Sequence, residues 1–433
     1  MYTAYIGRRI VDLYNERLND GPPLAPKDFF DEVVFPTFFD HDKYLFWPNN
    51  SPFAQVYSKK NSPDETKRQE ALVTLHEDIA AISQPSGHLF MGGQAVDVDA
   101  TTSGQVSDLS VETTAAEAYC SWFGFSASIG VGKLSLLVDQ DDVLLALLEG
   151  WALYRTYMEQ TPALKSHQLE TWNGCWIVHR FGNDYRPDDP LRDFNPDTGK
   201  AGKNIKLKTQ SWADVLFALA SNTPDESMSA YIFSLGQTNT TIGFRQLRLP
   251  EVDSLFRLYS HMYGEADGLL PGTLADVFEA DFSLYRASEQ GTLGLKALRP
   301  KDITKYMPGR NSKMPSSTRS KRTYTNYHIY QTWIIAMLNN QALIEVTEET
   351  ADALLKHAQS GTNARSKALN RAKQVLEASH KREFLEALTV VIEEGEEETE
   401  HFNALADEVV NMPASDFPLF ATLLRLKYAV INK

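Results

Sequence analysis

The chain has 433 residues, of which 42% are hydrophobic and 11% aromatic, enough for one very large domain or two to three ordinary ones. Its net charge of −15 argues against a general nucleic-acid coat protein. It does not exclude a locally basic groove, because the attraction of a charged ligand depends on where the charges lie. Cys120 and Cys175 form no CxxC or Cys/His pattern, which argues against a structural zinc site and a disulfide framework and fits a reducing cytoplasm.

Residues 1–20 place apolar side chains at helical spacing between polar ones, so we predict an amphipathic helix rather than a signal peptide. The chain contains no apolar run of about 18 residues, the length that a membrane-spanning helix needs. We therefore expect a cytoplasmic protein with no membrane partner.

Residues 35–55 (FPTFFDHDKYLFWPNNSPFAQ) are dense in aromatic rings and proline, and we expect the rings to fill a core under irregular backbone. Asp40, His41 and Asp42 lie within this segment. Further metal ligands are missing nearby, so we predict a hydrogen-bonded structural histidine and no metal; a metal-dependent enzyme is the weakest alternative. Residues 64–82 follow as an amphipathic helix.

Residues 84–110 (QPSGHLFMGGQAVDVDATTSGQVSDLS) are rich in glycine and in small polar side chains and show no continuous periodicity. Glycine permits close approach of another backbone, glutamine can pair with adenine in the major groove, and serine can contact phosphates. The candidates are Ser103, Gly104, Gln105 and Ser107. An ordinary surface loop explains the same composition.

Residues 129–133 (IGVGK) lack the spacing and the following Ser/Thr of a phosphate-binding loop, which excludes a nucleotide hydrolase of that type. Residues 143–157 are apolar nearly all round and predict a buried helix in which Gly150 lets a neighbour approach closely. Residues 172–181 are typical of a buried strand or short helix.

Residues 183–208 change from acidic to basic, and their last part alternates lysine with apolar residues, as on an exposed strand or hairpin edge. Lys203, Lys206 and Lys208 lie there. Edge lysines often only prevent pairing between sheets, and they would equally contact phosphates if a nucleic acid lay across them.

Residues 231–235 alternate as in a strand, and GQTNTTIG follows as a turn with β-branched residues. Asn239 and Thr240 belong to this amide and hydroxyl cluster, and Arg245 and Arg248 flank it.

Residues 299–333 hold eight Lys or Arg and one acid, with five Tyr or Trp between them. We expect residues 308–320 to form a mobile loop, because Pro, Gly, Ser, Asn and Thr bury little apolar surface. Cations there suit a phosphate backbone, and the flanking rings could stack on unpaired bases. The alternative is a solvated interdomain linker. The candidate cations are Arg310, Lys313, Arg319, Lys321 and Arg322.

Residues 364–394 predict one long helix with a basic first half, which includes Arg371 and Lys373, and an acidic end. This polarity opposes the helix dipole, so helix stability alone does not account for it, whereas a nucleic-acid or protein surface would. The chain should end in a bundle of about four helices.

The predicted fold class is α+β: a mixed, helix-rich N-terminal domain with irregular loops and short sheets, plus a C-terminal helical bundle. We expect domain boundaries at 1–298, a basic aromatic linker loop at 299–329 and the bundle at 330–433. Because no GxSxG, HExxH or dinucleotide-binding turn is present, we expect a binding protein rather than an enzyme, with no cofactor.

The segments FFDEVVFPTFFDHDKYLFWPNNSPFAQ, ATTSGQVSDL and SLGQTNTTIGF resemble the large subunit of type I CRISPR Cascade complexes. The resemblance is to the Cas-eight family, in its compact subtype I-A/I-B Myxococcus type. It covers the N-terminal two-thirds in scattered blocks and the C-terminal bundle by architecture alone.

This resemblance implies a non-catalytic subunit that recognises the protospacer-adjacent motif and lines the path of the displaced strand in the R-loop, while base pairing supplies sequence specificity. Its partners would be the CRISPR guide RNA, target DNA and the backbone and guide-handle-binding subunits. A helicase-nuclease acts afterwards in antiviral defence, or a transposition apparatus in RNA-guided transposition.

The resemblance also implies roles for individual residues. Gln105, with Ser103 and Ser107, would approach the recognition duplex, and Gly104 would admit its backbone. Asn239, Thr240 and Arg245 would hold the backbone of the guide or target. Two groups are assigned by charge alone: Lys203, Lys206 and Lys208 to duplex phosphates, and Arg310, Lys313, Arg319, Lys321, Arg322, Arg371 and Lys373 to the unwound strand.

The net negative charge departs from a protein that binds DNA by itself and fits a subunit that acts within an assembly. The alternative from another class is a structural or adaptor protein whose polar loops bind protein partners.

Overall fold

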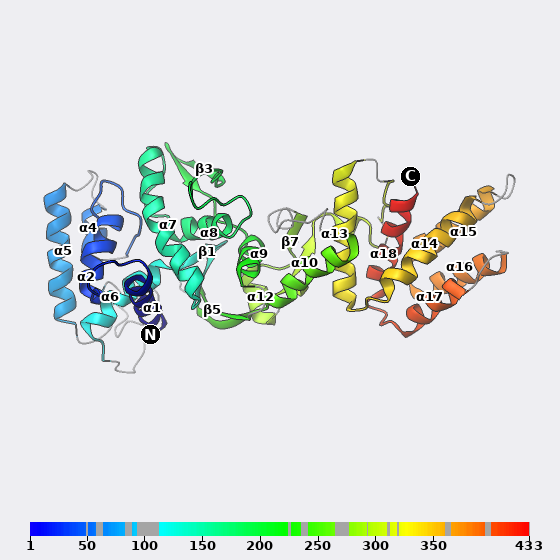
Figure 1. Ribbon diagram of the computed structural model, residues 1–433, viewed down its shortest axis with the longest axis horizontal. Helices are drawn as coiled ribbons and strands as arrows, with labels where there is room; N and C mark the ends of the chain where they lie inside the picture. Colours follow the sequence, from blue (N-terminus) through cyan, green and yellow to red (C-terminus); the bar gives the residue numbers. More distant parts are fainter. Residues whose placement is uncertain are drawn as a thin grey trace. The chain divides into compact units, whose positions relative to one another are not determined.

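α-Helices dominate the structure, and three small antiparallel sheets complete it within the part of the chain described here (Figure 1). The predicted α+β class is confirmed. The computed structural model describes residues 1–48, 51–57, 64–82, 89–92, 112–223, 227–234, 241–264, 277–291, 293–309, 312–317, 320–359, 365–394 and 400–432.

The chain divides into two compact units. Unit 1 comprises Met1–Pro250 and Phe282–Gly294, and unit 2 comprises Glu251–Asp281 and Leu295–Lys433. The sequence placed the end of the N-terminal domain at residue 298. In the structure Glu251–Asp281, from the middle of the chain, belongs to unit 2, and unit 1 resumes at Phe282.

Unit 1 begins with the predicted amphipathic helix, α1 (Tyr2–Arg17), which buries Ile6, Ile10 and Leu13. It packs against α6 (Ala115–Ser126), whose N-terminus is a capping box. The two helices approach closely because each contributes a glycine at the crossing. A Cβ on Gly7 would meet the Cys120 carbonyl oxygen, and one on Gly124 would meet the Thr3 carbonyl oxygen.

The aromatic segment forms the core as predicted. The rings of Phe30, Phe39, Phe46 and Phe53 surround the buried Trp122, with centroid distances of 5.6–6.4 Å. The elements of this region are α2 (Pro26–Phe29), the π-helical turn η1 (Phe30–Val34), α3 (Phe35–Phe38), α4 (Pro52–Tyr57) and α5 (Glu65–Ala80). Asp64 caps α5 by accepting the Lys67 N–H, which confirms the helix predicted there.

The other helices and the sheets of unit 1 follow in the chain. The helices are α7 (Asp141–Gln160), α8 (Leu169–Arg180), α9 (Trp212–Asn222) and α12 (Leu284–Gln290). The four-stranded sheet has the antiparallel order β1-β2-β5-β6, from β1 (Ile129–Val131), β2 (Leu134–Val138), β5 (Met228–Ser234) and β6 (Thr241–Leu247). A separate hairpin pairs β3 (Thr198–Ala201) with β4 (Asn204–Leu207).

The IGVGK segment is a hairpin and not a phosphate loop. Gly132 and Lys133 form the two-residue turn between β1 and β2, and Gly132 has a φ of 61°, which glycine adopts without steric cost. The predicted buried helix is also present. In α7 a Cβ on Gly150 would meet the Trp176 ring of α8. For residues 172–181 the sequence allowed either a buried strand or a short helix. Most of them lie in α8.

Unit 2 is a helical assembly with one two-stranded sheet in the part described. Its small elements are β7 (Phe278–Ala280), which pairs with β8 (Leu298–Pro300), and the 3-10 turns η4 (Leu295–Ala297) and η5 (Ile303–Lys305). Its helices are α10 (Leu249–Tyr263), which starts at the end of unit 1, α13 (Lys321–Leu338), α14 (Leu343–Gln359), α15 (Arg365–Glu377), α16 (Lys381–Glu394), α17 (Glu400–Asn411) and α18 (Phe417–Ile431).

The apolar helix α18 organises this unit by packing on both α13 and α14. Arg425 of α18 is only 1% exposed, and its guanidinium donates to the Leu376 and Tyr306 carbonyl oxygens. The C-terminal bundle is confirmed, but from α13 onward it has six described helices rather than about four. None of the helices in the described ranges is both long and apolar enough to cross a membrane.

The linker predicted to extend to residue 329 is wrong, because α13 already begins at Lys321. Ser320 caps this helix by accepting the Thr323 N–H at 3.1 Å. Tyr327, Tyr330 and Trp333 therefore lie on a helix that packs into the bundle, where they are 2–4% exposed. These three rings are core residues and do not form the base-stacking surface that the sequence suggested.

The prediction of a single long helix over residues 364–394 is also wrong. The helix is interrupted between Glu377, the last residue of α15, and Lys381, the first residue of α16. The Glu383 carboxylate accepts the Ser379 N–H at 2.8 Å and its hydroxyl at 3.0 Å, so the second helix has its own start. The two helices pack against each other. Leu369, an apolar residue of α15, is 36% exposed.

The glycine contact between α1 and α6 gives a stability prediction. Gly7→Ala and Gly124→Ala should each lower the free energy of unfolding by about 1–3 kcal/mol or more, because a methyl group would overlap backbone atoms. Urea unfolding followed by circular dichroism measures this. Gly199→Ala is the control, since its Cβ would have its nearest neighbour at 3.7 Å, and it should change stability by less than about 0.5 kcal/mol. A Gly7→Ala variant as stable as the control would contradict the packing.

Candidate nucleic-acid interface

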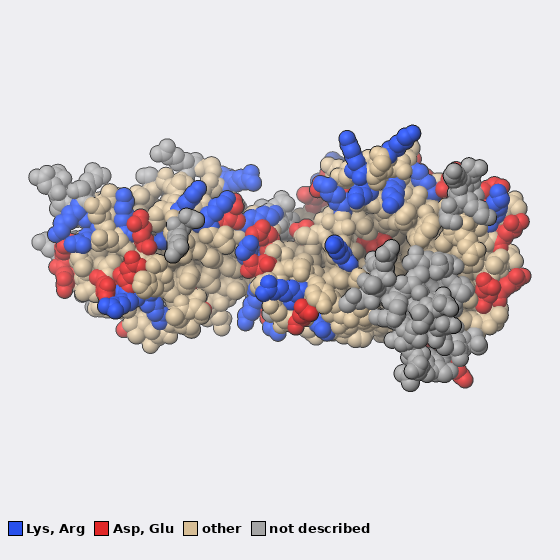
Figure 2. Space-filling model, turned by 180° about the vertical axis from the view of Figure 1, so that it is seen from behind, with Lys and Arg blue, Asp and Glu red and all other residues tan. Residues whose placement is uncertain are grey.

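The β3–β4 hairpin presents the lysines that the sequence placed on an exposed edge. Gly202 and Lys203 form its two-residue turn, with Gly202 at a φ of 62°. Lys206 and Lys208 are two residues apart and so share one face. Figure 2 shows lysine and arginine side chains projecting from the part of unit 1 that carries this hairpin.

The hairpin is held by main-chain bonds to the preceding loop. The Ile205 N–H donates to the Ala163 carbonyl at 2.9 Å, and the Lys165 N–H donates to the Ile205 carbonyl at 2.8 Å. Lys208 Nζ lies 3.3 Å from Asp197 Oδ2, so part of its charge is neutralised. Lys203 and Lys206 are exposed and have no ion-pair partner among the described residues. These two ammonium groups stand on a fixed support and face solvent.

Arg245 has contacts that compete with its predicted role. It lies on β6, and its Nε donates to the Ser288 carbonyl of α12 at 2.8 Å, while NH1 donates to the Phe244 carbonyl at 2.8 Å. The guanidinium therefore ties the sheet to a neighbouring helix. This structural function leaves fewer of its donors for a phosphate.

Exposed aromatic rings beside Arg245 were missed by the sequence reasoning. Phe244 is 54% exposed and Tyr5 is 47% exposed. The Tyr2 ring joins them, with centroid distances of 4.8 Å to Phe244 and 5.8 Å to Tyr5. Rings held in this way are a platform on which unpaired bases can stack. No signal in the sequence around Phe244 shows that its ring is exposed, because exposure depends on tertiary contacts.

The predicted cations at the start of α13 lie at a pocket of about 690 Å³ in unit 2. Lys321 and Arg322 are both exposed and occupy the first turn of the helix. The pocket is also lined by Val277, Lys301, Asp302, Thr325, Asn326, Ile329 and Tyr330. The Tyr330 hydroxyl donates to the Lys301 carbonyl at 2.7 Å, which ties the helix to the loop after β8.

The charge of this pocket favours an anion. Asp302 is the one carboxylate among the lining residues that the structure describes, and Lys305 Nζ pairs with it at 2.6 Å. Cations at a helix N-terminus oppose the dipole by a few tenths of a kcal/mol each, so the helix does not gain from Lys321 and Arg322. An anion in the pocket would meet both the cations and the positive end of the dipole. Lys313 is exposed but is not a lining residue.

Arg371 and Lys373 of α15 differ in their surroundings. Arg371 NH2 lies 3.7 Å from Glu394 Oε1 on α16, and Lys367 Nζ lies 2.9 Å from the same oxygen. The basic helix thus packs beside the acidic end of the next one. This packing accounts for the charge polarity that the sequence attributed to an external surface. Lys373 is exposed and has no ion-pair partner in the described ranges.

Eight predicted residues lie outside the described residues. They are Ser103, Gly104, Gln105, Ser107, Asn239, Thr240, Arg310 and Arg319.

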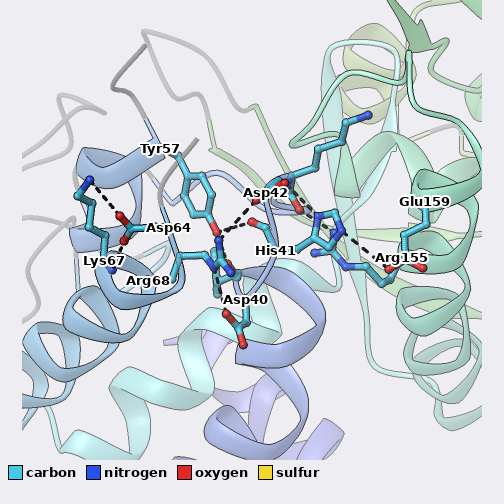
Figure 3. Close-up of polar contacts among 11 residues, drawn as sticks. Asp40, His41, Asp42, Tyr57, Asp64, Lys67, Arg68, Arg155 and Glu159 are labelled. Carbon is cyan, nitrogen blue, oxygen red and sulfur yellow. Dashed lines mark hydrogen bonds and ion pairs between the residues drawn. The ribbon is translucent and has the colours of Figure 1, made fainter. Parts of the chain in front are cut away.

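The Asp40–His41–Asp42 segment is held by cations (Figure 3). Arg68 Nε pairs with Asp40 Oδ1 at 3.0 Å, and its NH1 lies 3.6 Å from Asp42 Oδ1. The Arg155 guanidinium donates to the Thr37 carbonyl at 2.6 and 3.0 Å and to the Lys43 carbonyl at 2.7 Å. These contacts fix the loop by charge and hydrogen bonding.

His41 is hydrogen-bonded, as the sequence predicted. Its Nδ1 accepts the Lys43 N–H at 2.9 Å, and its Nε2 lies 4.0 Å from Glu159 Oε1. Burial and then the Arg155 charge lower the pKa of the imidazole. Among the described residues no group of three or more His, Cys, Asp or Glu could hold a metal ion.

Comparison with known proteins gives no relative. No protein-family model and no curated protein matches the sequence, and no solved structure matches the fold.

Two matched substitutions separate structural cations from solvent-facing ones. Arg245→Met should lower the free energy of unfolding by about 1–2 kcal/mol, because the Ser288 and Phe244 carbonyls lose a charged donor. Lys206→Met should change it by less than about 0.5 kcal/mol. Urea unfolding of both variants checks this. Equal stabilities would show that Arg245 does not tie β6 to α12.

Proposed function

We propose that this chain is the non-catalytic large subunit of a type I CRISPR Cascade complex. In this role it recognises the protospacer-adjacent motif and stabilises the R-loop, for antiviral defence or RNA-guided transposition. It would work in the cytoplasm with guide RNA, target DNA and the other Cascade subunits. The sequence blocks quoted above support this proposal, and so does the placement of cations on an acidic chain.

The pocket at the start of α13 carries the proposal. A chain of net charge −15 places Lys321 and Arg322 there, although the helix dipole disfavours cations at this end. Arg371, by contrast, lies near a carboxylate of its own bundle. Phosphates bound at this pocket would release condensed counterions, which is the main source of affinity for a strand without sequence preference. We assign this pocket to the displaced strand.

The parts of unit 1 take the remaining roles. Lys203 and Lys206 would contact duplex phosphates from the β3–β4 hairpin, and Lys208 would contribute less because Asp197 pairs with it. Phe244 and Tyr5 would stack on an unpaired base. Gln105 would read the motif, with Ser103, Gly104 and Ser107 beside it. Asn239 and Thr240 would hold the guide or target backbone.

An adaptor that binds protein partners is the alternative, and the exposed rings of Phe244 and Tyr5 favour it. The two functions differ in what accompanies the purified chain. A Cascade subunit expressed with its neighbouring genes should copurify with RNA and excess ultraviolet absorbance from nucleic acid. An adaptor should copurify with proteins alone.

A reconstituted complex tests the pocket assignment. The double substitution Lys321→Glu with Arg322→Glu should weaken target binding and reduce the salt slope of log K by about 1.4, since each single-strand phosphate contact contributes about 0.7. Affinity is measured by filter binding at several salt concentrations.

The matched control is Lys133→Glu with Lys356→Glu, which makes the same change in net charge at two exposed lysines outside the pocket. It should leave the slope unchanged. If the pocket variant also keeps the wild-type affinity and slope, the displaced strand does not pass this pocket.

A further inference from the structure

A second pocket, of about 230 Å³, lies within unit 2 among α10, α13, α14 and α18. Its lining includes Tyr263 of α10, Tyr324, His328 and Gln331 of α13, Glu348 of α14 and Lys427 of α18. The volume is smaller than that of drug-sized sites. The pocket therefore fits one small molecule or a part of a larger one.

The charges of this pocket cancel. Lys427 Nζ lies 2.7 Å from Glu348 Oε2, and the lysine side chain is only 9% exposed. A buried lysine paired at this distance has little attraction left for a phosphate or a carboxylate. At the pocket at the start of α13, by contrast, Lys321 and Arg322 have no ion-pair partner within the described ranges. The second pocket thus favours a neutral ligand.

The buried amide of Gln331 on α13 makes a hydrogen bond through its oxygen, while its NH2 group has no partner among the described residues. Gln331 is 1% exposed, and its Oε1 accepts the Tyr263 hydroxyl at 2.7 Å. Its Nε2 is buried and has no hydrogen-bond partner among the described residues. Leaving such a donor unsatisfied costs about 1–3 kcal/mol, so an occupant with an acceptor atom would be stabilised here.

Aromatic rings give the pocket a fixed wall. The Tyr263 ring stacks on the His328 imidazole, with a centroid distance of 3.7 Å and an interplanar angle of 9°. The Tyr324 ring lies against the same imidazole, with a centroid distance of 4.1 Å. Tyr324, His328 and Gln331 are spaced i, i+4 and i+7, so they form one face of α13. Lys321, Arg322 and Thr325 lie toward the other pocket.

We propose that this pocket binds a single unpaired nucleobase. A base is neutral and planar, and its carbonyl group and neighbouring ring N–H match an amide donor and a carboxylate acceptor. The base could come from a nucleic-acid strand, a source that rests on the proposed function, or from a free nucleoside, a source that does not. Both offer the same chemistry to Gln331, Glu348 and the tyrosine rings.

Calorimetry with the isolated full chain tests the proposal. Uridine and guanosine should bind saturably, and ribose should not. Gln331→Leu should weaken binding about tenfold, the loss expected of one hydrogen bond, and binding is compared at a temperature at which circular dichroism shows the variant folded, because the Tyr263 hydroxyl also loses its acceptor. Tyr324→Ala should weaken binding by removing part of the wall. Gln341→Leu makes the same chemical change at an exposed position outside the pocket and should bind like the wild type.

A second binding experiment, with oligonucleotide strands, identifies the source of the base. A short oligouridylate that binds more tightly than an abasic strand of equal length, in a Gln331-dependent way, shows that a strand supplies it. Binding of uridine alone shows a nucleoside site, and this result stands even if the chain never joins a Cascade complex. The proposal is overturned if neither the nucleosides nor the oligouridylate bind, or if Gln331→Leu and Tyr324→Ala both bind like the wild type. It is also overturned if the free amino acid leucine binds and uridine does not.

Discussion

Pairing between cations and acceptors within the protein decides what each cation of this acidic chain can do. Arg68 is held by Asp40, Lys427 by Glu348, and Lys367 by Glu394. The guanidinium groups of Arg155 and Arg425 donate hydrogen bonds to backbone carbonyls. A cation used in this way supports the fold, and its removal leaves an acceptor unsatisfied. Lys203 and Lys206 of the β3–β4 hairpin and Lys321 and Arg322 of α13 have no ion-pair partner in the described part of the chain, and this is why we assign them to an external polyanion.

The sequence predicted the elements whose signals are local. Helical spacing of apolar residues defined both α1 and α5. The hairpin of lysines followed from strict alternation. The errors came from long-range packing. Tyr327 and Trp333 stand in a basic string that resembles a linker, yet both are buried on α13, which packs against α18 and β8, and the Trp333 ring donates to the Leu298 carbonyl of β8. Composition over a short window cannot show which faces another segment will cover.

The candidate site was predictable in its charges but not in their pairing. Lys321 and Arg322 could be identified from the sequence because they stand out against an acidic background. Nothing local distinguishes them from Arg371, whose neighbour Glu394 is 23 residues away on the next helix, and the break between α15 and α16 creates that pair. Phe244 and the partnerless amide of Gln331 were missed for the same reason, since exposure and hydrogen bonding depend on tertiary contacts.

Photo-crosslinking in a reconstituted Cascade complex tests the central claim most directly. The displaced DNA strand would carry 4-thiothymidine and the 5′ end of the guide 4-thiouridine, and mass spectrometry would locate the crosslinked peptides. We expect displaced-strand crosslinks in residues 299–333, including the first turn of α13, and guide crosslinks in residues 235–247. Crosslinks confined to other subunits, or to α16 and α17 of this chain, would contradict it.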